Sequence, residues 1–102
     1  MAISIASKTD GNEFIILLDG RLDHYALKQF CDTYEAAPEQ TRRYVVDMAK
    51  LKTLDSSGLG MLLLLHSHAG GKPDSVRLIN ANTTVLKLLC IAKYEDLFEI
   101  DC

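Results

Sequence analysis

The chain has 102 residues, of which 48% are hydrophobic and 25% are charged. That balance is typical of one compact domain, residues 1–102, and it excludes a disordered, collagen-like or low-complexity protein. The formal charge of −3 argues against a general nucleic-acid binder, because such proteins are normally basic.

Neither a signal peptide nor a membrane span is expected. The opening residues lack a basic segment followed by a long apolar run, and the longest apolar run, Met61 to Leu65, is far short of the roughly 20 residues that a spanning helix needs. Cys31, Cys90 and Cys102 form no C-x-x-C pair, so zinc binding and thioredoxin-like chemistry are not indicated. We therefore expect a reduced, cytoplasmic protein without metal or cofactor, in which Cys102 has no assigned role.

Two strands are expected at the start of the chain. Residues 3–5 alternate as a short edge strand does, and the pair Asp10-Gly11 indicates a turn before the second strand. The continuous apolar run at residues 14–18 is typical of a strand that is covered on both faces. Gly20 is expected to end it.

The next segment predicts a helix and a third strand. Asp23 is of the residue type that caps helices. One helical stripe of apolar residues follows it, made of Leu27, Phe30, Cys31 and Tyr34. Residues 44–46 then predict a short buried strand that Asp47 closes.

The second half of the chain continues the alternation. The helix after residues 55–60 is apolar nearly all round, so it is expected to be central and to end at Gly70-Gly71. Residues 76–79 predict a strand, and residues 97–100 predict a last one. Between them we expect a helix that Asn80 or Asn82 caps, with inward residues Val85, Leu88, Leu89 and Ile91 or Ala92.

This order of elements indicates an α/β fold. Strands that alternate with helices favour mostly parallel pairing, here after an opening hairpin. The expected architecture is a mixed sheet of four to five strands with about three to four packed helices.

The stretch Asp55-Ser56-Ser57-Gly58-Leu59-Gly60 carries the most informative chemistry. It places two serines at the expected start of a helix, where unpaired N–H groups and a partial charge of about +0.5 favour a phosphate. Gly58 and Gly60 have no side chain, so a partner or a phosphate group can approach closely. On spacing alone, Ser-Ser-Gly is more typical of an ordinary capping sequence, and the glycines match neither a dinucleotide-binding nor a Walker motif.

The run at residues 55–60 resembles the signature of the STAS-domain family of bacterial anti-sigma factor antagonists. Gly20-Arg21-Leu22-Asp23 resembles a second marker of that family, and Tyr44-Val45-Val46-Asp47-Met48 resembles the strand before the signature. The resemblance extends over essentially the whole chain and implies a STAS-like fold. In particular, the chain resembles small single-domain members from Gram-negative bacteria, which act downstream of switch phosphatases and kinases and influence motility or surface growth.

This resemblance implies an anti-anti-sigma factor rather than an enzyme. In the family, the first serine after the aspartate is phosphorylated, and that residue is Ser56 here. An anti-sigma factor with serine kinase activity adds the phosphate, and a PP2C-like phosphatase removes it. The unphosphorylated form binds the anti-sigma factor and so releases a sigma factor. No nucleic acid or membrane partner is implied, and the expected oligomeric state is a monomer or a weak dimer.

The residues expected to contact the partner surround Ser56. They are Asp23, Asp55, Ser57, Gly58, Leu59 and Gly60. Structural roles remain open beside the functional ones: Asp55 either supplies a negative charge to the helix N-terminus or orients Ser56, and Asp23 is an N-cap or a contact. Ser57 is a cap or the phosphorylated residue. Residues 61–65 are core or, in part, an exposed surface for a partner.

Two other classes of function stay as alternatives. A constitutive STAS scaffold would use Ser56 only as a cap and would bind its partner equally before and after phosphorylation. A small serine or nucleotide hydrolase is disfavoured because no G-x-S-x-G motif is present. His66 and His68 are two residues apart and so point to different faces of a helix, which argues against a metal site, and His24 is expected at the surface.

Overall fold

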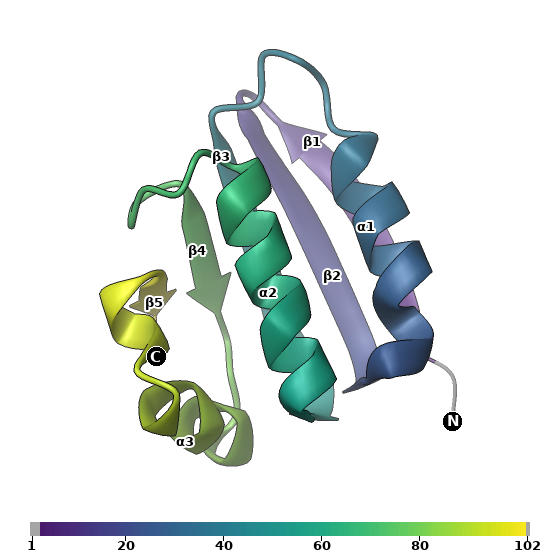
Figure 1. Ribbon diagram of the computed structural model, residues 1–102. Helices are drawn as coiled ribbons and strands as arrows, with labels where there is room; N and C mark the ends of the chain where they lie inside the picture. Colours follow the sequence, from purple (N-terminus) through teal and green to yellow (C-terminus); the bar gives the residue numbers. More distant parts are fainter. Residues whose placement is uncertain (1–2, 102) are drawn as a thin grey trace.

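A computed structural model describes residues 3–101, in which five strands form one sheet and three α-helices pack on it (Figure 1). The strands are β1 (Ser4–Asp10), β2 (Glu13–Leu22), β3 (Arg43–Leu54), β4 (Val76–Ile79) and β5 (Glu99–Asp101). The helices are α1 (Leu27–Glu35), α2 (Ser56–His68) and α3 (Thr83–Ile91), with short 3-10 turns η1 (His24–Ala26) and η2 (Tyr94–Asp96). Cys102 lies outside the described residues.

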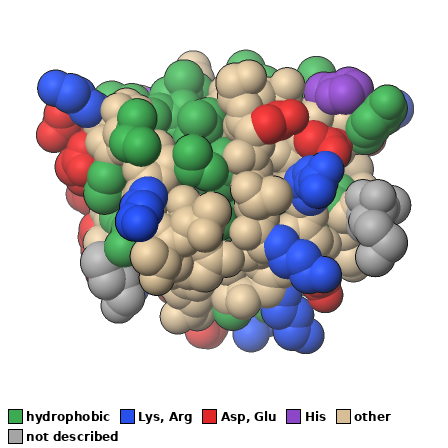
Figure 2. All heavy atoms as spheres, turned by 90° about the horizontal axis from the view of Figure 1, so that it is seen from below, with side chains coloured by type: hydrophobic (Ala, Val, Ile, Leu, Met, Phe, Trp, Pro, Cys, Tyr) green, Lys and Arg blue, Asp and Glu red, His purple; other side chains and the backbone are tan. Residues whose placement is uncertain are grey.

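The predicted α/β class and order of elements are confirmed. The strands lie in the order β1-β2-β3-β4-β5; β1 and β2 are antiparallel, and the other neighbours are parallel. Gly11, with a φ of 62°, makes the turn between β1 and β2. Because β2 and β3 are parallel, their carboxyl ends share one edge of the sheet, at the bottom of Figure 1. Figure 2 views the molecule from that end.

The helices α1 and α2 lie on the same face of the sheet (Figure 1). Burial along β2 therefore alternates: Phe14, Ile16 and Leu18 are buried, whereas Ile15 and Leu17 are half-buried. The prediction that this strand is covered on both faces was wrong. An unbroken apolar run is ambiguous, because neighbouring side chains on the open face also shield a central strand from part of the water.

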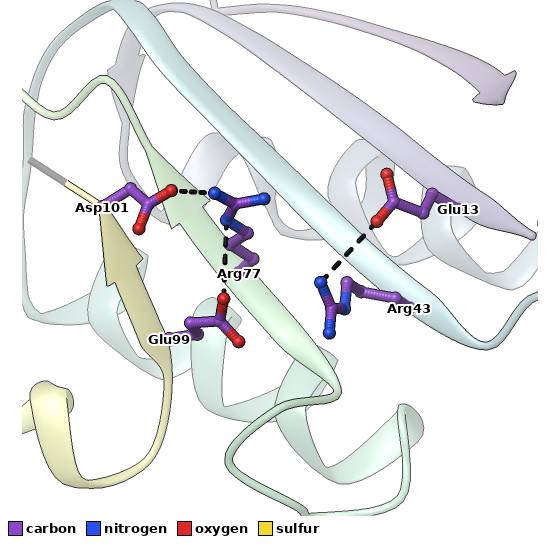
Figure 3. A network of polar contacts seen from close by, with 5 residues as sticks. All are labelled: Glu13, Arg43, Arg77, Glu99 and Asp101. Carbon is purple, nitrogen blue, oxygen red and sulfur yellow. Dashed lines mark hydrogen bonds and ion pairs between the residues drawn. The ribbon is translucent and has the colours of Figure 1, made fainter.

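The other face of the sheet carries ion pairs between neighbouring strands (Figure 3). Arg77 on β4 bonds to Asp101 and lies 3.7 Å from Glu99, both on β5. Arg43 on β3 lies 3.8 Å from Glu13 on β2. The hydrogen bond to Asp101 raises the pKa of the Arg77 guanidinium further above its usual value. These half-exposed pairs contribute little to stability.

The strands extend further than the sequence predicted. β1 pairs with β2 over seven residues, and β2 passes through Gly20 to Leu22. The parallel pairing of β2 with β3 shifts register at Gly20, which has a φ of 114°, and then continues to the pair Leu22–Leu54. β3 likewise passes Asp47, because hydrogen bonding to the neighbouring strand outweighs a local break signal. Both strands thus reach the same edge.

Each helix has an outward side on which at least one apolar residue is exposed. In α1, Phe30 and Tyr34 are buried, but Leu27 is exposed. In α2, Leu63 is 40% and Leu64 46% exposed, so the helix is not buried all round, and residues 61–65 divide between core and exposed surface, as one of the two alternatives predicted. In α3, Val85 and Leu89 are buried, whereas Ile91 is exposed. Helices that pack on one side of a sheet bury one stripe only, whatever residues occupy the other side.

The predicted ends of the later helices are confirmed. Asn82 caps α3, because its Oδ1 accepts a hydrogen bond from the Val85 N–H at 2.8 Å. Its amide also donates to the carbonyl of Leu51 at 3.0 Å, which ties the start of α3 to β3. Gly70 and Gly71 both have positive φ and end α2. The last strand, β5, begins two residues later than the predicted segment 97–100.

Candidate phosphorylation and partner-binding site

The residues that the sequence singled out lie where β2 and β3 end and α2 begins (Figure 1). Asp23 follows Leu22, the last residue of β2, and Asp55 follows Leu54, the last residue of β3. Because Leu22 and Leu54 are paired neighbours in the sheet, the two aspartates leave it side by side. Both line one open hollow of about 400 Å³.

Both aspartates cap the turns that follow them. Asp23 Oδ1 accepts a hydrogen bond from the Tyr25 N–H at 3.1 Å, at the start of η1. Asp55 Oδ1 accepts one from the Gly58 N–H at 3.0 Å, in the first turn of α2. Such caps typically contribute about 1 kcal/mol each. The structure therefore shows the capping role of both residues, and their contact with a partner stays a prediction.

Ser56 is the first residue of α2, and it is exposed. Ser57, the second residue, is half-buried. The Asp55 side chain satisfies the Gly58 N–H, and the Asp55 carbonyl accepts from the Leu59 N–H at 3.0 Å. The N–H groups of the first two residues of a helix have no partner within it. A group on Ser56 Oγ thus stands at the positive end of α2, where an anion is favoured.

Gly58 allows α2 to pack closely against the ends of β2 and β3. A Cβ on this buried residue would lie 2.4 Å from the carbonyl oxygen of Leu22 and 2.9 Å from Cβ of Leu54. Ordinary contacts at such a Cβ are 3.4–4 Å, so no side chain fits without moving backbone. The absence of a side chain at Gly58 therefore serves the fold, and the predicted contact of this buried residue with a partner stays a prediction.

Leu59 and Gly60 complete the signature on α2. The Leu59 carbonyl accepts a hydrogen bond from the Tyr94 hydroxyl at 2.8 Å, which links α2 to η2. Burial raises the pKa of the Tyr94 hydroxyl. A Cβ on Gly60, in contrast to Gly58, would meet no atom within 4 Å.

Tyr25 belongs to this site, and sequence reasoning missed it. Its side chain is 84% exposed, the most of any large hydrophobic residue described, and it lines the hollow with Asp23 and Asp55. The ring lies against the exposed His24, with 4.0 Å between centroids. The sequence did contain a signal for an exposed Tyr25: an aromatic residue that follows a capping aspartate closely and lies outside the apolar stripe of the helix. Figure 2 shows acidic side chains at this end between a hydrophobic area and Lys or Arg side chains.

The histidines of α2 point apart, as their spacing predicts. His66 lies against Phe98, with ring centroids 5.2 Å apart, and His68 lies 4.7 Å from Tyr34 and 5.7 Å from Tyr44. Within residues 3–101, no group of three or more metal-binding side chains is placed to hold an ion. In the same part of the chain, no helix is both long and apolar enough to cross a membrane.

The fold and the site together define a small α/β domain that presents a serine at a helix N-terminus. Residues 5–99 match the family described as "Mlab, STAS domain". The STAS-domain containing protein PA14_20770 of Pseudomonas aeruginosa (strain UCBPP-PA14) is 46% identical over 100 residues, which are 98% of this chain and 99% of that protein. This chain belongs to the STAS domain family, as its signature predicted.

Solved structures share the architecture. The unphosphorylated anti-sigma factor antagonist SpoIIAA has a TM-score of 0.80 at 22% identity, covering 97% of this chain and 89% of that one. The Bacillus cell fate determinant SpoIIAA in its phosphorylated form has a TM-score of 0.73 at 20% identity, covering 97% and 92%. An anti-sigma factor antagonist from Mycobacterium paratuberculosis has a TM-score of 0.79 at 14% identity, covering 97% and 85%. At these identities the likeness establishes the SpoIIAA-like fold.

Proposed function

We propose that this protein is an anti-sigma factor antagonist that acts by partner switching. Without phosphate it binds an anti-sigma factor, or a serine kinase of the anti-sigma type, and so releases a sigma factor; phosphorylation of Ser56 abolishes that binding. The observation that carries this proposal is the exposed position of Ser56 at the first residue of α2. The likeness of the fold to SpoIIAA, solved in both phosphorylated and unphosphorylated forms, supports it.

In the proposed reaction this domain is the substrate, and the partner kinase is the catalyst. Ser56 Oγ takes the γ-phosphoryl group of ATP, the hydroxyl proton is lost, and ADP leaves. The N-terminus of α2 favours the new anion by about 0.3–1 kcal/mol, so the fold accommodates it. The half-buried Ser57 is less accessible to a kinase, which supports Ser56 as the acceptor.

Phosphorylation changes the charge of the interface more than the shape of the domain. The phosphate adds about −1.5 to −2 charges on the residue next to Asp55, which lines the same hollow as Asp23. A charge that is buried against a partner without a counter-charge costs roughly 3–5 kcal/mol, which lowers affinity a hundredfold or more. Binding is therefore lost without refolding.

The remaining partners follow from the same proposal. A PP2C-like phosphatase restores the binding form by hydrolysing the phosphoserine. The kinase, the phosphatase and the sigma factor all act in the cytoplasm, where we place this protein.

The test begins with a pull-down from the native host using the wild type, Ser56→Ala and Ser56→Asp, read by mass spectrometry. The partner is then purified and supplied with labelled ATP. We expect Ser56→Ala to abolish labelling and the matched control Ser57→Ala to retain it. Labelling that survives Ser56→Ala would show that the site is wrongly assigned.

The affinity of the purified partner for the protein before and after phosphorylation tests the switch itself. We expect a loss of at least about a hundredfold. Equal affinities would favour a constitutive STAS scaffold in which the serine only caps the helix.

A further inference from the structure

A second hollow, of about 680 Å³, lies at the amino ends of β2, β3 and β4, at the top of Figure 1. The turn between β1 and β2, the start of β3 and the loop between α2 and β4 surround it. Pockets for small ligands commonly have about 300–1,000 Å³. Ser56 stands at the opposite end of α2, about 20 Å away along the helix axis. This hollow is therefore separate from the candidate phosphorylation site.

Hydrogen bonds hold the three segments around this hollow in place. The Arg42 N–H donates to the Asn12 carbonyl at 2.8 Å, which joins the start of β3 to the turn before β2. The Tyr44 N–H donates to the Ser75 carbonyl at 2.9 Å, which joins β3 to the loop before β4. Ser75 is buried, and its hydroxyl and N–H donate to the Lys72 carbonyl at 2.6 Å and 3.1 Å. The hollow is therefore formed before any ligand enters it.

Three cationic side chains, Arg42, Arg43 and Lys72, line this hollow, although the whole chain has a net charge of −3. Arg42 and Lys72 are exposed, and within residues 3–101 neither side chain makes an ion pair or a hydrogen bond. Arg43 lies 3.8 Å from Glu13, which is too far for a hydrogen bond (Figure 3). The donors of all three side chains are therefore open to a ligand.

The nearby carboxyl end of α2 does not occupy these cations. The last carbonyl groups of a helix carry a partial negative charge, and Lys or Arg side chains often bind them. Here the carbonyls of His66 and Ser67 accept hydrogen bonds from the N–H groups of Gly71 and Gly70, at 2.9 Å and 3.2 Å. The loop that follows α2 thus caps the helix with its own backbone.

We propose that this hollow binds a small phosphate monoester, whose phosphoryl group is held by Arg42, Arg43 and Lys72. Guanidinium and ammonium donors match the three terminal oxygens and nearly two negative charges of such a group. Glu13 and Asp74 also line the hollow, so a singly charged anion gains little against their repulsion. This site goes beyond the proposed function and does not depend on it.

The rest of the lining indicates the remainder of the ligand. The carboxylates of Glu13 and Asp74 accept hydrogen bonds from hydroxyl groups, which favours the phosphate ester of a sugar or another polyol. No aromatic side chain lines the hollow, so a nucleobase has no ring to stack on. We therefore expect a sugar phosphate to bind better than inorganic phosphate does.

Titration of ribose phosphate into the isotope-labelled full chain, in a phosphate-free buffer and followed by two-dimensional NMR, tests the site. We expect saturable shifts of the amide signals of residues 12–13, 42–43 and 69–75, and none from ribose. Signals of residues 56–58 should stay unchanged. Shifts centred on residues 56–58 would overturn the inference, because the anion would then bind the N-terminus of α2. Shifts that do not saturate in the millimolar range would overturn it too.

Matched variants test the three cations. Arg42→Gln and Lys72→Gln should each weaken the Kd for ribose phosphate about tenfold, because each removes a charged hydrogen-bond donor. Lys8→Gln removes the same charge from an exposed position on β1 and should leave the Kd unchanged. Equal losses in all three variants would refute a specific site. If Arg42→Gln lowers the Tm, Lys72→Gln decides.

Inorganic phosphate separates a sugar phosphate site from a site for any anion. It should shift the same amide signals as ribose phosphate but bind more weakly, because it has no polyol hydroxyl groups for Glu13 and Asp74. Equal affinities of the two ligands would refute the assignment of a phosphate monoester.

Discussion

The substitution Gly58→Ala tests whether α2 sits directly on the ends of β2 and β3. The added Cβ would be 2.4 Å from the Leu22 carbonyl oxygen and 2.9 Å from Leu54 Cβ, against ordinary contacts of 3.4–4 Å. Backbone must therefore move by about 1 Å, and because the obstacle is backbone and not a flexible side chain, the cost of overpacking here is about 2–3 kcal/mol, the upper part of the usual range. The better helix propensity of alanine offsets about 1 kcal/mol. We expect a net loss of about 1–2 kcal/mol, which lowers the Tm by roughly 5–15 °C.

Urea and thermal unfolding followed by circular dichroism measure this loss. Gly60→Ala is the matched control, because it makes the same chemical change in the same helix at a position where a Cβ meets no atom within 4 Å. The two variants should therefore shift stability in opposite directions. A Tm for Gly58→Ala at or above that of wild type would refute the reasoning, since the carbonyl of Leu22 would then leave room for a methyl group.

Three further predictions concern the cap, the switch and alkaline pH. In urea unfolding, Asp55→Ala should lower the free energy of unfolding by about 1 kcal/mol. Asp55→Asn should keep most of that stability, because an amide oxygen also caps a helix. Equal losses in the two variants would contradict the capping role. Ser56→Asp should keep the wild-type Tm but bind the partner more weakly than wild type does, with a smaller loss of affinity than phosphorylation causes. If repulsion is the cause, about 1 M salt should restore part of the affinity. Burial raises the folded-state pKa of Tyr94 above 10, so its contribution to stability is complete below pH 10 and is lost as the pH rises through that pKa. The urea concentration at the midpoint of unfolding should therefore decrease as the pH rises above 10. It should decrease less steeply in Tyr94→Phe.

Local chemistry made the order of elements and their starting points predictable. Asp23, Asp55 and Asn82 cap turns or helices in the structure, and each precedes its segment as a capping residue should. Gly70-Gly71 ends α2 for an equally local reason, a positive φ. The serine signature could be found because it is contiguous, so its spacing is complete in the sequence.

Errors arose where a residue meets segments from elsewhere in the chain. Strand ends were misjudged because Gly20 and Asp47 were assessed without the hydrogen bonds that β2 and β3 exchange. The sequence left open which of residues 61–65 are exposed, because hydropathy describes a side chain and not its neighbours, and the structure exposes Leu63 and Leu64. Tyr25 was missed because the hollow that it lines forms only when the ends of β2 and β3 lie together.

The two glycines of the signature show where sequence stops and tertiary structure begins. By itself the sequence determined the α/β class, the helix caps and the serine at the start of α2, because each depends on residues within a few positions. In sequence, Gly58 and Gly60 are alike. Only the tertiary structure places the Leu22 carbonyl against Gly58 and open space beside Gly60, because packing brings together atoms that are far apart along the chain.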